Sequence, residues 1–250
     1  RGIQPIIGTQ LDVFYDNGDE ATPYNTSRPA KGSVVLLVQN ETGYKNLCKI
    51  ISRSYINKEP NAPTGLHVDK LTDLTDGLIC LSGGPRGPIG KLIADQKETM
   101  ANKLTDQFLS LFDGRFYIEL MRHGDFNIAV DQTMIKIAMD KNIPLVASND
   151  CYFANPDMHE AHDALLCIAG STYVMEKDRR HETRDHYFKS QDEMVEYHAL
   201  SIGYSAAKES HKALVYVKLF YLIDPERINL LYHLQTLPFI STAIYKHITL

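Results

Sequence analysis

The chain has 250 residues, of which 44% are apolar, and a formal net charge of −5 at pH 7. Its length allows one large α/β domain or two smaller ones, and its apolar content suffices for a sizeable core. The negative charge argues against a dedicated basic DNA-binding domain, although it does not exclude a local basic patch.

Membrane and secretion signals do not occur in the sequence. No apolar run approaches the roughly 20 residues that span a bilayer, and the first residues do not form a signal peptide. The chain starts at Arg1 in the middle of a pattern, which suggests a fragment. The four cysteines form no CxxC pair, so neither a zinc cluster nor a disulfide framework is indicated; they are Cys48, Cys80, Cys151 and Cys167. We therefore expect a reduced, cytoplasmic setting and no membrane partner.

Short apolar runs predict strands at residues 5–8, 34–38, 78–82, 116–120 and 144–147. A first helix is expected to begin at Asn40, which is a suitable N-cap residue. Its expected apolar face comprises Tyr44, Leu47, Cys48 and Ile51. Further helices are expected at about 100–112, ending near Gly114, and at about 128–139. The last runs from Asn155-Pro156 to about Cys167, with proline at its first position.

This alternation of strands and helices predicts a parallel sheet or an α/β barrel. In both folds, chemistry takes place at the carboxyl-terminal tips of the strands. The residues at the expected tips are Gln10, Gly83, Gly84, Arg122, Asn149 and Asp150.

The glycine-rich segment 82–91 follows an expected strand, as a phosphate-binding loop would. A P-loop requires glycine where Pro85 stands, and a hydroxyl residue where Leu92 stands. We therefore predict a strand-to-helix turn and not a nucleotide site.

Histidines occur in two places that could suggest a metal. His159 and His162 are three residues apart, whereas a zincin helix needs a spacing of four, where Asp163 stands. We predict that they lie on the exposed face of a helix whose core face carries Ala161, Leu165 and Ile168. His181 and His186 lie in a charged stretch that predicts a loop.

Asp150 is the strongest single candidate for a site residue, because an aspartate just after a buried strand is placed to bind a metal or transfer a proton. The alternative is a turn residue that caps its own backbone. Cys151 beside it is either a soft ligand or, more commonly, a small buried thiol. No partner ligands are evident at the other strand tips, so a divalent cation would have too few donors.

The last fifth of the chain has a different composition. After Glu196 the acidic residues are only Glu209, Asp224 and Glu226, while tyrosines become frequent. The alternatives for residues 197–250 are the start of a further region and a shifted reading frame, and we favour the shifted frame.

Several motifs occur in a fixed order along the chain, at residues 2–8, 36–47, 77–84, 116–124, 147–150, 161–168, 178–180 and 187–194. Together they resemble the N-terminal polymerase-and-histidinol-phosphatase (PHP) domain of bacterial DNA polymerase III alpha subunits. The resemblance covers residues 1–196 and implies a PHP-type distorted (β/α) barrel that is incomplete at its N-terminus.

The departures from the family pattern concern its metal ligands. Family members with an intact site begin with a histidine-rich strand, which this chain lacks. Where they have glutamate, histidine, cysteine and a second histidine, this chain has Gln10, Ser33, Gly84 and Tyr152, and only Asp150 matches. These replacements cannot substitute for carboxylate, thiolate and imidazole ligands. The resemblance thus implies no catalytic residue, no metal ligand beyond the weak candidate Asp150, and no cofactor here.

The resemblance also implies a function. The parent would be a replicative DNA-directed DNA polymerase whose Mg²⁺-binding aspartates lie outside this chain. The PHP region would serve as a scaffold that docks the separate proofreading exonuclease subunit, and the parent would contact DNA and other holoenzyme subunits. Two alternatives stay open: a metal-dependent phosphoesterase or 3′–5′ exonuclease, and a non-functional truncated gene product.

Overall fold

The computed structural model describes residues 5–18, 30–56, 62–121, 123, 128–190 and 192–194, and the backbone of 215–216. The chain divides into two compact units, Gly8–Leu219 and the combination of Arg1–Ile7 with Phe220–Leu250. Of the second unit only residues 5–7 are described. The fold below is that of the first unit.

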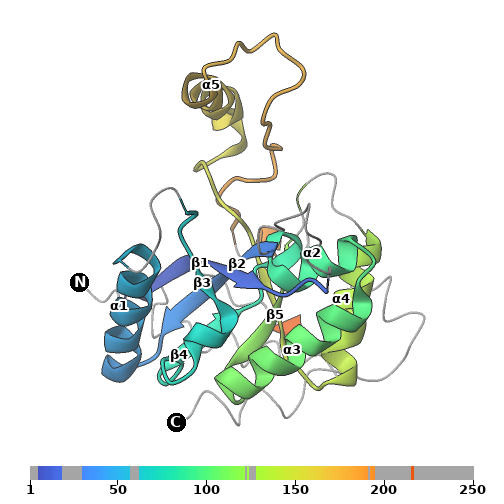
Figure 1. Ribbon diagram of the computed structural model, residues 1–250. Coiled ribbons are helices and arrows are strands. Elements are labelled where there is room, and N and C mark those ends of the chain that lie inside the picture. The colour runs from blue at the N-terminus through green and yellow to red at the C-terminus, as the bar shows by residue number, and fades with distance from the viewer. Residues whose placement is uncertain are drawn as a thin grey trace, which may run out of the picture. The chain divides into compact units, whose positions relative to one another are not determined.

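Seven strands form one mixed sheet in the order β3-β1-β2-β4-β5-β6-β7 (Figure 1). Antiparallel pairing joins β1 (Gly8–Tyr15), β2 (Ala30–Val38) and β4 (Leu78–Leu81). Parallel pairing continues through β5 (Phe116–Met121), β6 (Leu145–Ser148) and β7 (Val215–Tyr216), and β3 (Leu66–His67) pairs in parallel with β1. The predicted α/β class is confirmed. The described strands form an open sheet that is consistent with a PHP-type barrel.

Of the two predicted alternatives, a parallel sheet and an α/β barrel, the parallel sheet does not hold for the first half of the chain. β1 and β2 pair in antiparallel register from Gly8 opposite Leu37 to Tyr15 opposite Ala30. No helix among the described residues connects these two strands, and antiparallel neighbours need no crossover helix. The helix-linked strands β4, β5 and β6 do follow the predicted parallel pattern.

The core lies on one face of this sheet. Side chains alternate between the two faces along each strand, so that Leu36 and Ile118 enter the large core whereas Leu37 and Val146 belong to a small cluster on the other face. The large core also contains side chains from α1 (Glu41–Ile56), α2 (Pro88–Ala94), α3 (Glu98–Phe112) and α4 (Ile128–Asp140). Short 3₁₀ turns η1 (Val68–Leu71), η2 (Gly84–Arg86) and η3 (Pro156–Met158) complete the described elements together with α5 (His159–Gly170).

The predicted first strand and first helix need correction. The strand begins at Gly8, and Ile6 and Ile7 are exposed instead of buried. Asn40 caps α1 as predicted, because its Oδ1 accepts the N–H of Gly43 at 3.0 Å. The buried face of α1, however, is formed by Gly43, Asn46, Leu47, Ile50 and Ser54, so Tyr44 and Cys48 are exposed. Small and polar residues thus share the buried side with Leu47 and Ile50, which the apolar pattern alone does not reveal.

The predicted last helix is displaced and turned. Asn155-Pro156 begins the 3₁₀ turn η3, and α5 starts only at His159. Ala161, Leu165 and Ile168, the predicted core face, are exposed. The side of α5 that faces the rest of the described structure instead carries Cys167, which is the one buried residue of the helix.

Residues 197–250 lie outside the described residues except for the backbone of β7, which pairs with β6. The boundary at residue 196 and the shifted reading frame therefore remain predictions. None of the described helices has the length and apolar character that crossing a bilayer requires.

Candidate functional site

The residues expected at the strand tips do not all come together. Gln10 lies inside β1, and Ser33 lies inside β2, where its hydroxyl donates to Asp12 at 2.6 Å. Arg122 lies outside the described residues. The tips that do meet belong to the parallel strands, where residues after β4 and β6 reach the same edge of the sheet.

Asp150, two residues after β6, is the centre of this edge. Its Oδ2 accepts hydrogen bonds from Arg86 Nη1 at 3.2 Å and from the Tyr152 hydroxyl at 2.9 Å. Arg86 Nη1 also donates to the Tyr152 oxygen at 3.0 Å. Burial, together with the charge of Asp150, raises the pKa of Tyr152 above its ordinary value. The one carboxylate that matches the family's ligand pattern is thus held by a guanidinium and a phenol.

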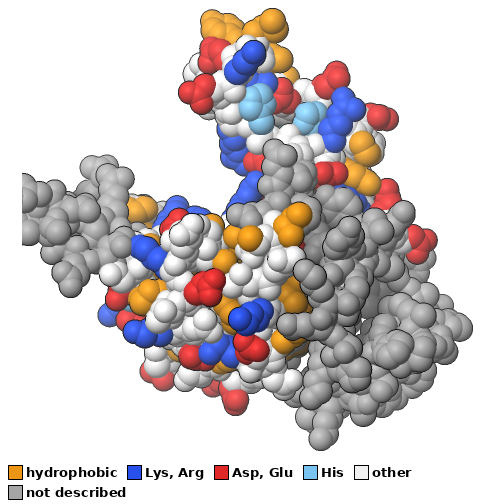
Figure 2. All heavy atoms as spheres, turned by 90° about the vertical axis from the view of Figure 1, so that its right-hand side faces the viewer, with side chains coloured by type: hydrophobic (Ala, Val, Ile, Leu, Met, Phe, Trp, Pro, Cys, Tyr) orange, Lys and Arg blue, Asp and Glu red, His pale blue; other side chains and the backbone are white. Residues whose placement is uncertain are grey.

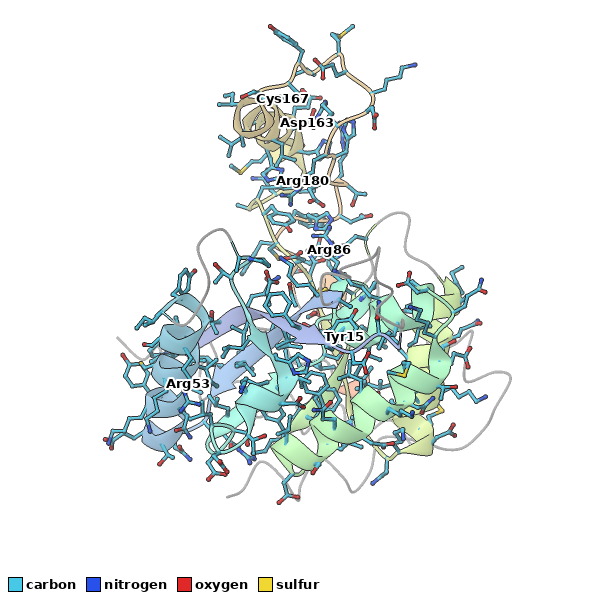
Figure 3. All side chains as sticks on the ribbon, viewed as in Figure 1. Tyr15, Arg53, Arg86, Asp163, Cys167 and Arg180 are labelled. Carbon is cyan, nitrogen blue, oxygen red and sulfur yellow. The ribbon has the colours of Figure 1, made fainter. Side chains whose placement is uncertain are left out.

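Arg86 joins Asp150 to a second carboxylate, that of Glu182. Arg86 Nη2 donates to Glu182 Oε2 at 2.9 Å, and Arg180 donates to Glu182 Oε1 at 2.7 Å. Figure 3 shows Arg86 and Arg180 near each other although they are far apart in the sequence. Burial favours a higher pKa for Glu182, but the hydrogen bonds from Arg180 and Arg86 lower it below its ordinary value. The carboxylate of Glu182 is therefore held by one arginine on each of its two oxygens.

A row of ring contacts, two stacked and one tilted, extends the site away from Asp150. The ring centroids of His123 and His186 are 3.9 Å apart, those of His186 and Tyr152 are 5.1 Å apart, and those of Tyr152 and His162 are 5.3 Å apart. Burial lowers the pKa of His123 to about 4, with a further contribution from His186. His123 is therefore neutral near pH 7.

Asn149 and the backbone of Asp150 both contact His123 Nε2. Asn149 Nδ2 donates to the carbonyl oxygens of Tyr187 at 2.6 Å and Asp185 at 3.2 Å, so its Oδ1 is left as an acceptor. That oxygen lies 2.7 Å from His123 Nε2, and the backbone N–H of Asp150 is directed at the same nitrogen at 3.3 Å. His186 Nδ1 donates to the carbonyl oxygen of Asp150 at 2.7 Å.

A buried carboxyl group lies behind this edge. Glu119 of β5 accepts the backbone N–H of Gly83 at 3.1 Å and the Ser148 hydroxyl at 2.5 Å, and so connects β5 to the ends of β4 and β6. Burial raises the pKa of Glu119 to about 7, although both hydrogen bonds oppose the shift. Its protonation state is therefore sensitive to pH in the neutral range.

The donors present do not fit a metal centre. No group of three or more His, Cys, Asp or Glu side chains in the described part of the chain could hold an ion. Asp150 and Glu182 accept hydrogen bonds from arginines, and the hydrogen-bonding nitrogens of His123 and His186 are engaged with Asn149 and the backbone. The prediction that this chain has no metal ligand and no cofactor remains a prediction.

The histidines of α5 occupy the inner side of that helix, which corrects the predicted exposed face. His159 Nε2 lies 2.8 Å from the carbonyl oxygen of Glu182, and His162 stacks on Tyr152. Asp163 accepts two hydrogen bonds from Arg179, each of 2.6 Å. Polar contacts therefore fix α5 to the segment that follows it.

Arg86, His123, Glu182 and His186 were not expected to belong to a site. Arg86 lies in the glycine-rich segment 82–91, which forms the predicted strand-to-helix turn through η2 and α2. The sequence could have indicated Arg86 through its position just after β4, because β4 and β6 run in the same direction and their ends lie at one edge of the sheet. Glu182 and His186 gave no signal, because a charged loop without periodicity does not reveal which of its side chains are buried.

Comparisons with known proteins agree with this architecture. Residues 1–123 match the family model described as PHP domain. The DNA polymerase III subunit alpha of Caulobacter vibrioides is 39% identical over 199 residues, which cover 77% of this chain and 17% of that protein. The subunit of the same name from Rickettsia bellii is 35% identical (80% of this chain, 16% of that protein), and that from Pseudomonas aeruginosa is 32% identical (78% and 16%).

The family match over residues 1–123 and the mixed α/β fold identify a PHP domain in this chain. Over most of its length the chain is related to the alpha subunit of bacterial DNA polymerase III. It spans about one sixth of the length of these curated relatives.

The role of Arg86 in holding the site together can be measured. Replacing it by glutamine is expected to lower the free energy of unfolding by about 1–2 kcal/mol, a value discounted because the side chain is half exposed. Arg86→Lys should recover less than half of this loss, since lysine lacks the planar fork that reaches two carboxylates. The exposed Arg53 of α1 provides the control, and Arg53→Gln should change the free energy by less than about 0.5 kcal/mol. Equal stability of the Arg86→Gln and Arg53→Gln variants in urea unfolding would contradict this role.

Proposed function

We propose that this chain is the PHP portion of a replicative DNA polymerase alpha subunit and that it acts there as a structural scaffold. The parent protein would synthesise DNA from a primer with Mg²⁺ held by residues outside this chain. The observation that carries the proposal is the contact between Asp150 and Arg86 at 3.2 Å. A guanidinium of the protein itself supplies the positive charge that a metal ion would supply in a phosphoesterase.

The scaffold proposal is supported by how the site connects segments. Arg86 follows β4, Asp150 follows β6, and Glu182 lies beyond α5, so the ion pairs tie three distant parts of the sequence together. As partners we propose the other subunits of the polymerase III holoenzyme, with the proofreading exonuclease subunit docking on this region, and DNA through the parent.

A chimaera tests the proposed function. The region of the Caulobacter vibrioides alpha subunit that matches this chain is replaced by the corresponding residues of this chain. We expect the chimaera to extend a primed template, and we expect Arg86→Glu in it to lower its melting temperature. A folded chimaera that cannot extend primers would contradict the proposal.

The phosphoesterase alternative has its own test on the 250-residue chain. A Mn²⁺-dependent 3′–5′ exonuclease or phosphodiesterase activity that disappears with chelator and with Asp150→Asn would favour that alternative. We expect activity no higher than that of the Asp150→Asn variant.

A further inference from the structure

Helix α1 carries three cationic side chains in line on the side that it exposes to solvent. We define the basic row as Lys45, Lys49 and Arg53, all of which are exposed. Successive members are four residues apart, so they lie one above another along the helix and extend over about 12 Å. The sequence places no acidic residue in α1 after Glu41. Figures 1 and 3 show α1, with Arg53, on the left of the molecule and away from Arg86.

The basic row is a local concentration of positive charge on a chain whose net charge is −5. Figure 2, which views the molecule from the side opposite α1, shows acidic and basic side chains intermixed. Within α1, Lys45 Nζ lies 2.7 Å from Glu41 Oε1, but these side chains are 66% and 80% exposed. An exposed pair of this kind contributes little stability and opens readily, so Lys45 remains available to an anion.

Two tyrosines form a second line along the exposed side of α1. Tyr44 is 47% exposed and Tyr55 is 62% exposed. Both lie about 130° around the helix axis from the basic row. The short side chains of Cys48 and Ser52, which are also exposed, lie between the two lines. Cations and aromatic rings therefore run side by side over the same surface.

The stability of the helix does not require this arrangement. A cation in the last turn interacts favourably with the helix dipole, which accounts for Arg53 but not for Lys45 or Lys49. The packing of α1 is supplied by its other side, where Leu47 and Ile50 enter the large core. The basic row and the two tyrosines are therefore available for a partner.

The chemistry of this surface selects single-stranded nucleic acid. Such a strand presents a line of phosphates, which lysine and arginine bind, and a line of unpaired bases, which stack on aromatic rings. A duplex keeps its base faces stacked inside the helix and would leave Tyr44 and Tyr55 without a role. Phosphates on the basic row and bases on the tyrosines would use both lines at once.

We propose that the solvent-facing side of α1 binds single-stranded DNA through the basic row and through Tyr44 and Tyr55. This inference rests on the proposed function, because a replicative polymerase works beside unpaired template strand. It gives the PHP region a DNA contact of its own.

Fluorescence anisotropy of a labelled 20-nucleotide oligo(dT), titrated with the 250-residue chain, tests the contact. At about 50 mM salt we expect a dissociation constant on the order of 10–100 µM, which is the range of non-specific binding. Raising the salt to about 200 mM should weaken binding about 20-fold, because three phosphate contacts to a single strand give a logarithmic salt dependence of about −2. An unlabelled duplex of equal length should compete less well than unlabelled oligo(dT).

Two sets of variants separate the basic row from net charge. Replacing all three residues of the row by glutamine should weaken binding at least about tenfold and remove most of the salt dependence. The control loses the same charge at exposed lysines of η1, α3 and α4 and should change the dissociation constant less than about twofold; it combines Lys70→Gln, Lys103→Gln and Lys136→Gln.

A third variant tests the tyrosines. Tyr44→Ala with Tyr55→Ala should weaken binding at least about tenfold, because each stacked base contributes about 1–3 kcal/mol, whereas the salt dependence should be kept. All of the replaced side chains are exposed, so each variant should keep the cooperative unfolding of the parent chain.

Several results would overturn the inference. No anisotropy change at chain concentrations far above about 100 µM would do so, as would equal weakening by the control set and by the row variant. Tighter binding of duplex, or no effect of the tyrosine variant, would assign the basic row to duplex phosphates. Binding to vesicles of anionic lipid in place of oligo(dT) would assign the face to a membrane surface.

The proposed function is tested separately by the chimaera. A chimaera that extends primers, combined with a chain that does not bind oligo(dT), overturns this inference and leaves the proposed function standing. A chain that binds oligo(dT) through the basic row, combined with a folded chimaera that cannot extend primers, contradicts the proposed function and leaves the DNA contact standing.

Discussion

Replacing Gly83 by alanine is expected to lower the free energy of unfolding by about 2–5 kcal/mol, or to abolish cooperative unfolding. Gly83 has a φ of 79°, which costs a residue with a Cβ about 1–2 kcal/mol. That Cβ would lie 1.8 Å from the carbonyl oxygen of Ser33, and the required shift of the backbone adds about 1–3 kcal/mol. Gly83 also donates to Glu119, so a shift disturbs the buried carboxyl group. Urea unfolding monitored by circular dichroism measures the loss.

Gly114 is the matched control for this substitution. Its φ of 74° is nearly the same, but no atom lies within 4 Å of the position that a Cβ would take. Gly114→Ala should therefore cost only about 1–2 kcal/mol. If both alanine variants lose the same stability, the close approach of Ser33 is not what requires glycine at position 83.

Replacing Glu119 by glutamine is expected to remove a pH dependence of stability in the neutral range. The folded-state pKa of Glu119 is about 7, raised by burial from an ordinary value of 4.5. The folded state therefore binds more protons than the unfolded state between these values. The stability contributed by the protonated group is fully present below pH 4.5 and is lost as the pH rises through 7. From pH 6 to 8 the loss should be about 1 kcal/mol.

His123 acts in the opposite direction and in a lower range. Its pKa is lowered by burial from 6.5 to about 4, so the stability from its neutral form is present above pH 6.5 and is lost as the pH falls towards 4. Above pH 6.5 the change in the free energy of unfolding with pH therefore reports the titration of Glu119 and not that of His123.

Urea unfolding at several pH values between 6.5 and 8.5 separates the two groups. Glutamine can accept from Gly83 and donate to Ser148, so Glu119→Gln should fold and give a flatter profile than the parent chain. The exposed Glu98→Gln variant is the control and should keep the parent slope. A Glu119→Gln profile parallel to the parent profile would show that another group titrates.

Elements with a full apolar repeat could be predicted from the sequence. α3 and β5 lie close to their predicted positions, because both bury regularly spaced side chains such as Phe108 and Ile118 in one core. The faces of α1 and α5 could not be predicted in the same way. In α1 the turn before β4 packs against Gly43 and accepts a hydrogen bond from Asn46, and in α5 hydrogen bonds and ring stacking hold the polar side inward. Tertiary contacts of this kind override helical periodicity.

The site was predictable in part: Gly83, Asn149 and Asp150 were expected at strand tips, and they lie in it. An aspartate after a buried strand is recognisable in the sequence, and the resemblance to the PHP domain marked the same residue. Arg86, which binds its carboxylate, comes from a glycine-rich turn, and Glu182, which binds Arg86, comes from a charged loop. Neither pattern shows which side chain is directed at the strand edge. Arg86 and Glu182 became identifiable only when the parallel order of β4, β5 and β6 was known.

The central claim is that Arg86, and not a metal ion, holds Asp150. Its most direct test is the metal content of the purified 250-residue chain after incubation with Mn²⁺ or Zn²⁺ and gel filtration, measured by inductively coupled plasma mass spectrometry. We predict less than one ion per chain, and the same content for the Asp150→Asn variant. Retention of two or more ions that the Asp150→Asn variant fails to bind would contradict the claim.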